Sequence, residues 1–202
     1  MASLISKLPI DVQTLLPRSG GYPEVKKLPQ PGDMAPALLD ENWTSAPHLV
    51  AFVRHCGCPF AQAEVESLGR ALKAHPNVRI VIVSHSSDEV VKDWFERVGK
   101  ANFPDEAKDV RLVADPKFEL YASWGIGQMG YSGMLNSDMI KSLKELAAQG
   151  IKNTETGEGS YRWQNSGGFA VDHGGKVQFS KLASHAGDTV NYEEAVKTVL
   201  QN

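Results

Sequence analysis

The stretch Leu49–Pro59 constrains the fold most strongly, because it joins a strand pattern to a helix start through a turn that holds both cysteines. The apolar run Leu49–Val53 has the pattern of a buried strand. Pro59 stands where a helix begins, since its fixed φ suits the first helical position and its missing N–H is not needed there. Cys56 and Cys58 lie between the two elements. This order predicts a thiol at a helix N-terminus, where backbone N–H groups and the helix dipole stabilise a thiolate.

The rest of the chain alternates strand and helix patterns and ends with an antiparallel pair. Strands are predicted at residues 49–54, 78–83, 110–114, 169–172 and 176–180. Helices are predicted at residues 59–74, 88–98, 116–124, 137–149 and 192–200. The second helix follows a capping box, in which Ser86 precedes Glu89 by three residues and takes the cap position. A central mixed β-sheet flanked by helices satisfies this order, so the predicted fold class is α/β.

The N-terminal part differs in composition from the rest of the 202-residue chain. Residues 1–45 contain six prolines and predict an extended arm, with one helical turn near Val12–Leu16. Residues 46–202 then form the folded domain. Arms of this kind wrap a domain or a partner subunit, so a homodimer is one expectation.

Charge and cysteine usage exclude several classes of function. The net charge is −3, from 24 acidic and 21 basic residues, so no single-sign field favours nucleic acid or an anionic membrane. The longest apolar run is far shorter than the ~20 residues of a membrane helix. The N-terminus has no basic region leading into a long apolar run, so no signal peptide is predicted. Two cysteines one residue apart are not the framework of a secreted scaffold, and a reducing, cytoplasmic location is expected.

Four residues of the cysteine turn are candidates for catalysis. Cys58 is either a reactive thiol or a small buried residue, and Cys56 is either its resolving partner or a packed strand-end residue. Their Cα atoms lie at most ~7 Å apart, near the upper limit of disulfide geometry. His55 suits proton transfer near neutrality, or it is a surface histidine. Arg54 binds a peroxide or carboxylate oxygen, or it is solvated. These groups are too local for a tetrahedral metal site, so no metal is predicted.

A glycine-rich segment, Gly125–Gly133, is the second candidate region. Its first six residues match GxGxxG by letter, but they follow a helix instead of a strand, which disfavours dinucleotide binding. We interpret the segment as a loop that covers an apolar substrate; the alternative is that its aromatic residues only cover the sheet edge. The predicted substrate-binding residues are Phe60, Trp124, Met129, Tyr131, Tyr161 and Trp163.

The chain resembles a known family at Arg54–Pro59, at Asp115–Gly125 and at Gly167–Asp172. It is similar to peroxiredoxin-like members of the alkyl hydroperoxide reductase/thiol-specific antioxidant family. The late Ala186-Gly187-Asp188 also looks like their peroxiredoxin-like 2 branch. The resemblance covers roughly residues 45–190 and implies a thioredoxin-like fold. The family carries Cys-x-x-Cys at the turn; Cys58 matches its first cysteine, and Ala61 stands at the second.

The resemblance implies a thiol-dependent oxidoreductase in which Cys58 attacks an organic hydroperoxide or endoperoxide. Cys56, glutathione or a thioredoxin-type protein then resolves the oxidised thiol, with no bound cofactor. Two residues depart from the family pattern: Ala61 replaces the second cysteine, and His55 stands three residues before Cys58, where typical peroxiredoxins carry Thr or Ser. They keep open a rival in which the fold serves non-redox catalysis or small-molecule binding in a specialised pathway. A non-catalytic subunit that docks through its arm is the third hypothesis.

Overall fold

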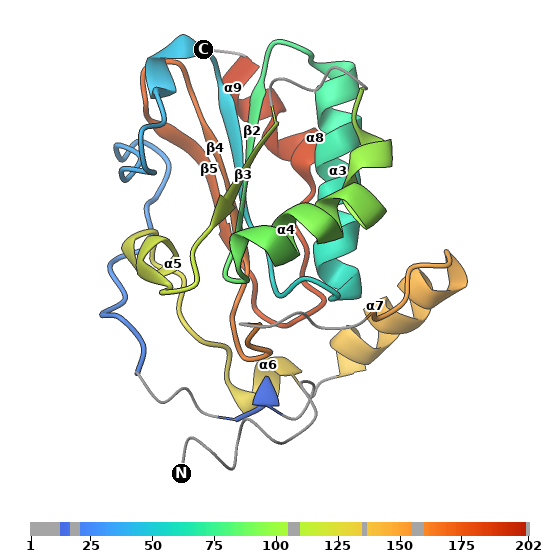
Figure 1. Cartoon of the computed structure of the whole chain (residues 1–202). Coiled ribbons are helices and arrows are strands. Elements are labelled where there is room, and N and C mark those ends of the chain that lie inside the picture. The colour runs from blue at the N-terminus through green and yellow to red at the C-terminus, as the bar shows by residue number, and fades with distance from the viewer. Residues whose placement is uncertain (1–12, 17–20, 105–109, 135–136, 155–159, 201–202) are drawn as a thin grey trace.

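The computed structural model describes residues 13–16, 21–104, 110–134, 137–154 and 160–200 (Figure 1). The central sheet has five strands in the order β3-β2-β1-β4-β5. The strands are β1 His48–Phe52, β2 Arg79–Ser84, β3 Val110–Ala114, β4 Gly167–Val171 and β5 Val177–Leu182. The first three strands are parallel, whereas β4 runs antiparallel to both β1 and β5. The predicted mixed sheet is therefore confirmed.

Helices surround this sheet and connect its strands. The longer ones are α3 Pro59–Ala74, α4 Asp88–Trp94 and α7 Ser137–Ala148. The shorter ones are α5 Glu119–Ser123, α6 Tyr131–Met134, α8 Tyr192–Ala195 and α9 Lys197–Leu200. A π-helical turn at Phe95–Gly99 extends α4, and 3-10 turns lie at Trp43–Ser45 and Lys100–Asn102.

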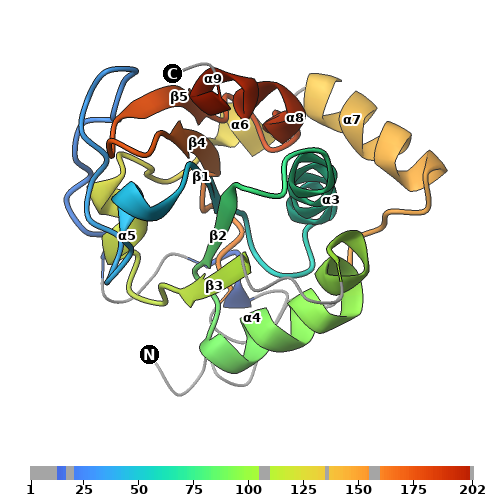
Figure 2. The same ribbon diagram turned by 90° about the horizontal axis from the view of Figure 1, so that it is seen from above.

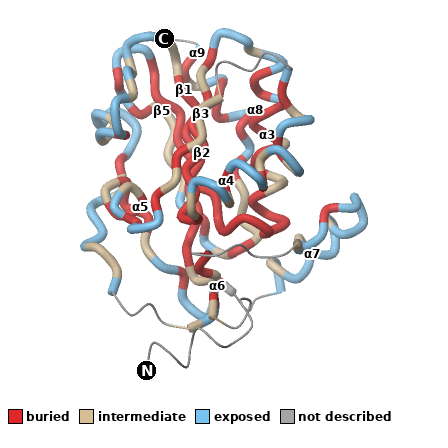
Figure 3. The backbone as a smooth tube through the Cα atoms, in the orientation of Figure 1, coloured by how far each residue is buried: buried red, intermediate tan, exposed pale blue. Residues whose placement is uncertain are grey.

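Two apolar cores lie on the two faces of the sheet, because alternate residues of each strand point to opposite sides. Leu49 and Ala51 of β1 pack on the face covered by α3, α4, α8 and α9. Val50 and Phe52 pack on the other face, against α5 and residues of the N-terminal segment. Figure 2 shows these layers from above, with α3 and α5 on opposite sides of the strands. Figure 3 shows that the strands form the buried centre.

The local sequence explains the beginning of α3, whose predicted bounds are confirmed. Cys58 is the N-cap residue in an extended conformation, and Pro59 occupies the first turn. The helix then continues until His75, whose backbone N–H closes it on Ala71 and Leu72 carbonyls. Phe60, Leu68 and their apolar neighbours on this helix pack into the core. The strong capping and apolar signals thus agree with the tertiary packing.

The cap of α4 was predicted one residue too early. Ser87, not Ser86, is the N-cap, and its side chain accepts a hydrogen bond from the Val90 backbone N–H. Ser86 instead points its hydroxyl at Ser160, 3.0 Å away. Both serines are good cap residues, but only Ser86 has a glutamate three residues later; its hydroxyl is used by Ser160 instead, and Ser87 takes the cap.

The predicted apolar face of α7 is only partly covered. No residue in the described part of α7 is buried, and Ile140 and Leu143 are 48% and 39% exposed. Met139 and Leu146 pack against the core through contacts that include α3. The helix lies at the rim of the molecule, as the exposed colours of Figure 3 show.

The described part of the N-terminal segment lies along the second face of the sheet. Backbone N–H groups of Lys26, Gly32 and Ala35 donate to carbonyls of the folded body over 2.8–2.9 Å. Leu38 is almost fully buried in the second core. Residues 1–12 and 17–20, which include the start of the predicted helical turn, lie outside the described residues. The division at residue 45 stays a sequence prediction.

Among the described residues, no helix is long and apolar enough to cross a membrane.

Candidate active site at the cysteine turn

The turn between β1 and α3 holds Cys58 at the start of the helix. Gly57 has a φ of 100°, a left-handed conformation that glycine adopts without a Cβ penalty. The Cys58 backbone N–H donates to the carbonyl of His55 over 3.0 Å, which closes the turn. The Cys58 side chain makes no capping hydrogen bond. Its sulfur is therefore not used to cap the helix, although the residue stands at the helix N-terminus.

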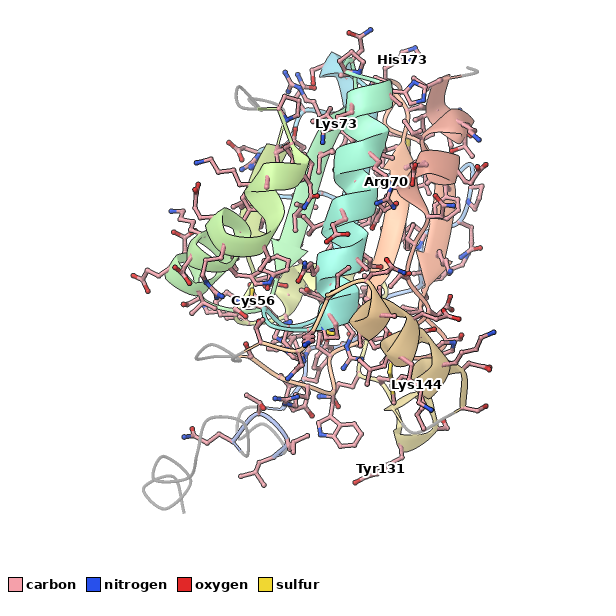
Figure 4. All side chains as sticks on the ribbon, turned by 90° about the vertical axis from the view of Figure 1, so that its right-hand side faces the viewer. Cys56, Arg70, Lys73, Tyr131, Lys144 and His173 are labelled. Carbon is pink, nitrogen blue, oxygen red and sulfur yellow. The ribbon has the colours of Figure 1, made fainter. Side chains whose placement is uncertain are left out.

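Cys56 lies in a different environment, beneath the turn. Its sulfur is 3.5 Å from the hydroxyl oxygen of Ser84, at the end of β2. Burial raises the pKa of the Cys56 thiol, and hydrogen bonds with the hydroxyls of Ser84 and Ser86 act in the opposite direction. Figure 4 shows Cys56 near the beginning of α3. The two cysteines are free thiols with only 2% and 4% of their surface exposed.

The other two turn residues are buried as well, not solvated. The Nδ1 atom of His55 lies 3.2 Å from the carbonyl of Cys56, an arrangement that fits a protonated Nδ1. The Nη2 group of Arg54 donates to the carbonyl of Arg162 over 2.5 Å. Arg54 and His55 are each 3% exposed. The structure thus brings an imidazole and a guanidinium cation to the cysteine turn and ties them to the backbone.

Aromatic side chains fasten the strand ends beside the turn. The Tyr121 hydroxyl lies within 3.0 Å of the Val83 carbonyl and also donates to the carbonyl of Val53 over 2.5 Å. The Nε2 atom of His85 accepts from the Tyr161 backbone N–H over 2.9 Å. These bonds link β1, β2, α5 and the segment that precedes β4 at one edge of the sheet.

A cavity of about 230 Å³ opens in the same group of loops. Four of the six predicted substrate-binding residues line it, and their side chains are aromatic or a thioether. Tyr131 is 76% exposed and meets Trp163 edge to face, with ring centroids 4.8 Å apart. Figure 4 shows Tyr131 at the periphery of the molecule. The lining residues are Leu15, Gln128, Met129, Gly130, Tyr131, Tyr161 and Trp163.

The other two predicted substrate-binding residues lie elsewhere. Trp124 is fully buried on the second face of the sheet, 4.8 Å from Phe169 and 5.4 Å from Phe52 between ring centroids. Phe60 is buried in the first core, on the first turn of α3. Neither lines the aromatic cavity, and the surrounding packing accounts for both side chains.

No pattern in the sequence indicated that the N-terminal segment contributes to this cavity. The backbone N–H and the Nε group of Arg162 donate to the carbonyl and the hydroxyl of Thr14, over 3.0 and 3.1 Å. The Trp163 ring N–H donates to the Leu15 carbonyl over 3.0 Å. Arg162 also accepts from Arg54 through its carbonyl. Arg162 thus connects the segment 13–16 to the cysteine turn.

A buried carboxyl on α3 was also missed by the sequence analysis. Glu64 is 2% exposed, and its Oε1 accepts from the Val190 backbone N–H over 3.2 Å. Burial raises the pKa of Glu64 to about 8. A signal was available, because Glu64 lies four residues after Phe60 and four before Leu68, inside the apolar stripe of the helix.

The described residues contain no group of three or more His, Cys, Asp or Glu side chains that could hold a metal ion. The cysteine turn brings together a thiol, a cation and an imidazole, whereas the aromatic cavity is lined by residues outside this turn.

Comparisons with known proteins identify the family of the chain. A family model described as AhpC/TSA antioxidant enzyme matches residues 66–185, more than half of the chain. The matched residues begin within α3, after the cysteine turn. No curated protein gives a significant match.

Solved structures show the same fold at low sequence identity. A peroxiredoxin-like protein from Aquifex aeolicus is 16% identical, with a TM-score of 0.57 over 88% of this chain and 90% of that chain. A thiol peroxidase from Chromobacterium violaceum is 13% identical, with a TM-score of 0.56 over 89% and 91%. Peroxidoxin BcpB from Mycobacterium tuberculosis is 15% identical, with a TM-score of 0.55 over 86% and 97%. The predicted thioredoxin-like fold is thereby confirmed.

Proposed function

Because the chain belongs to the AhpC/TSA antioxidant enzyme family and is a peroxiredoxin-like thiol oxidoreductase, we propose that Cys58 reduces an apolar organic hydroperoxide or endoperoxide. The observation that carries this proposal is the place of Cys58, which caps α3 without using its side chain as the cap. A thiolate at a helix N-terminus is stabilised by the dipole and by unpaired backbone N–H groups. The thiolate is the nucleophilic form of a cysteine.

The proposed first step breaks the O–O bond of the peroxide. The Cys58 thiolate attacks one oxygen, a sulfur–oxygen bond forms, and the other oxygen leaves as an alkoxide that takes a proton to become an alcohol. A hydroperoxide gives a sulfenic acid on Cys58. An endoperoxide leaves its product attached through the sulfur–oxygen bond until a second thiol displaces it. Arg54, a buried cation at the same turn, supports the developing negative charge.

The oxidised Cys58 then needs a second thiol. Cys56 is one residue away, and an external reductant such as glutathione or a thioredoxin-type protein is the other candidate. Either route returns Cys58 to its thiol without a bound cofactor. A small-molecule peroxide and a thiol reductant are therefore the proposed partners.

The aromatic cavity favours the proposal that the substrate is an apolar organic peroxide and not only hydrogen peroxide. A hydrogen peroxide scavenger does not need an apolar cavity, whereas an aromatic or aliphatic hydroperoxide gains by leaving water for one. Met129 and Tyr161 supply a buried floor, and the exposed Tyr131 and the half-buried Trp163 form the wall.

Replacing Trp163 by alanine tests this substrate class. We expect the Trp163→Ala variant to raise KM for cumene hydroperoxide about tenfold, since the aromatic contact is lost. Its turnover of hydrogen peroxide should stay close to the parent rate. Trp163→Phe keeps the aromatic face without the N–H donor to Leu15, so it should resemble the parent. An equal loss with both peroxides in Trp163→Ala would argue against substrate binding at this cavity.

Cysteine and histidine variants test the proposed chemistry itself. With cumene hydroperoxide and glutathione or thioredoxin, Cys58→Ser should reduce turnover to background. His55→Ala should slow the reaction by on the order of tenfold, because it removes one orienting hydrogen bond. Near-parent peroxidase turnover in Cys58→Ser would overturn thiol redox chemistry at Cys58.

A further inference from the structure

The hydroxyls of two serines surround the sulfur of Cys56. Ser84 is the last residue of β2, and its Oγ atom lies 3.5 Å from the Cys56 sulfur. The same Oγ accepts from the Ser86 backbone N–H over 3.4 Å. This bond uses one lone pair of Ser84 Oγ and leaves the hydroxyl hydrogen available for the sulfur. Ser86 offers a second hydroxyl to the thiol.

A third serine anchors this pair from a distant segment. The hydroxyls of Ser86 and Ser160 are 3.0 Å apart, although 74 residues separate them in the chain. Ser84 and Ser86 have no exposed surface, and Ser160 is 7% exposed. Because Ser87 caps α4, the hydroxyl of Ser86 is not needed for that role. Ser84 and Ser86 lie next to the buried thiol, and Ser160 contacts Ser86, so a chain of buried hydroxyls leads from the thiol to the segment before β4.

We propose that Ser84 and Ser86 are positioning residues that orient Cys56 and stabilise its thiolate, so that Cys56 and not an external thiol resolves oxidised Cys58. This inference rests on the proposed function, because it requires a sulfenic acid on Cys58. In the step, the Cys56 sulfur attacks the Cys58 sulfur and a sulfur–sulfur bond forms. The sulfur–oxygen bond breaks, and the leaving hydroxide takes up the proton that Cys56 released on forming its thiolate, so that water is the product. The disulfide is later reduced by the external thiol reductant.

The need for these donors follows from the burial of Cys56. A buried thiolate is poorly solvated, so its formation is unfavourable unless hydrogen bonds replace water. Once the thiolate forms, its sulfur has no hydrogen to give, so the Ser84 hydroxyl at 3.5 Å and the Ser86 hydroxyl can act as such donors. Among charged and titratable groups, Arg97 of the π-helical turn favours the thiolate, and Tyr121 of α5 interacts with it electrostatically. The Tyr121 hydroxyl is already hydrogen-bonded to the carbonyls of Val53, just after β1, and of Val83 in β2.

Single-turnover kinetics separate the two steps. Reduced parent, Ser84→Ala and Ser86→Ala proteins are mixed with cumene hydroperoxide without reductant. Quenched samples are analysed by mass for Cys58 sulfenic acid and for the intramolecular disulfide. We expect sulfenic acid to form at the parent rate in both variants, and disulfide formation to slow about tenfold. The pH of half-maximal disulfide formation should move upward, because a lost donor makes the Cys56 thiolate less stable.

A matched control and the remaining outcomes make the test decisive. Ser180→Ala removes a half-buried hydroxyl of β5 that has no hydrogen-bond partner among the described residues, and it should leave both steps unchanged. Equal slowing of both steps in Ser84→Ala and Ser86→Ala would show a merely structural role and overturn the inference. So would unchanged disulfide formation, or sulfenic acid without any disulfide in the parent. If cumene hydroperoxide does not oxidise Cys58 in the parent, the proposed function fails first.

Discussion

The Glu64→Gln variant is expected to be much more stable than the parent chain at alkaline pH and nearly equal to it at acidic pH. Glu64 is buried on α3, and burial raises its pKa from 4.5 to about 8. At about 1.4 kcal/mol for each pH unit, ionising this carboxyl inside the fold opposes folding by on the order of 5 kcal/mol. Glutamine has nearly the same shape and carries no charge. Its amide oxygen can still accept from the Val190 N–H.

The sign follows from proton binding in the two states. Between pH 4.5 and about 8 the unfolded chain has released the Glu64 proton while the folded chain still holds it. The folded state then binds more protons, so stability falls as the pH rises through this window. Below it, both states are protonated and the group has no effect on stability. Above it, the full destabilisation is present, and the glutamine variant escapes it.

Urea unfolding of parent and variant at several pH values measures this effect. Glu66→Gln is a suitable control, because it makes the same change on the same helix at a half-exposed position. Its stability should follow that of the parent at every pH. Parallel pH profiles for the parent and Glu64→Gln would show that the buried carboxyl is not protonated in the folded chain.

Local signals in the sequence were sufficient where a short stretch determines its own structure. Pro59 and the preceding cysteine turn predicted the start of α3 correctly, since capping and proline preference act within a few residues. The almost wholly apolar run before Ser84 predicted β2 to within a residue. Ser86 was misassigned as a cap because its partner, Ser160, is close only after folding.

In the candidate site, too, the local features could be predicted and the long-range contacts could not. The sequence placed Cys56 and Cys58 in one turn, and the turn geometry depends on residues next to each other. The aromatic cavity needs Leu15, the loop near Tyr131 and the segment at Trp163 to meet. No periodicity or motif indicates that these segments lie close together, because their proximity depends on the packing of segments far apart in the chain. Composition likewise could not show that Trp124 belongs to the second core and not to the cavity.

The packing of the N-terminal segment on the sheet leads to the second large effect, at Gly125. This residue has a φ of +76°, a left-handed conformation that costs a residue with a Cβ about 1–2 kcal/mol. An added Cβ would also lie 2.4 Å from the Cα of Leu28 and 2.6 Å from its backbone nitrogen. Backbone atoms cannot rotate away as a side chain does. The segment is held at this place by the bond from the Lys26 N–H to the Ala122 carbonyl.

We therefore expect Gly125→Ala to lower the free energy of unfolding by about 2–5 kcal/mol, from backbone strain and overpacking together. The added methyl group forces the segment away from α5, so the bond from the Tyr22 hydroxyl to the neighbouring Ile126 carbonyl should also weaken. Gly130→Ala, in the same loop, is the control: its added Cβ meets nothing within 4 Å, and stability should change by at most about 0.5 kcal/mol. Urea unfolding compares the two variants, and limited proteolysis reports whether cleavage near Leu28 becomes faster in Gly125→Ala. Equal stability of the two variants would mean that residues 22–28 do not pack against Gly125 in solution, and that the N-terminal segment contributes little to the fold.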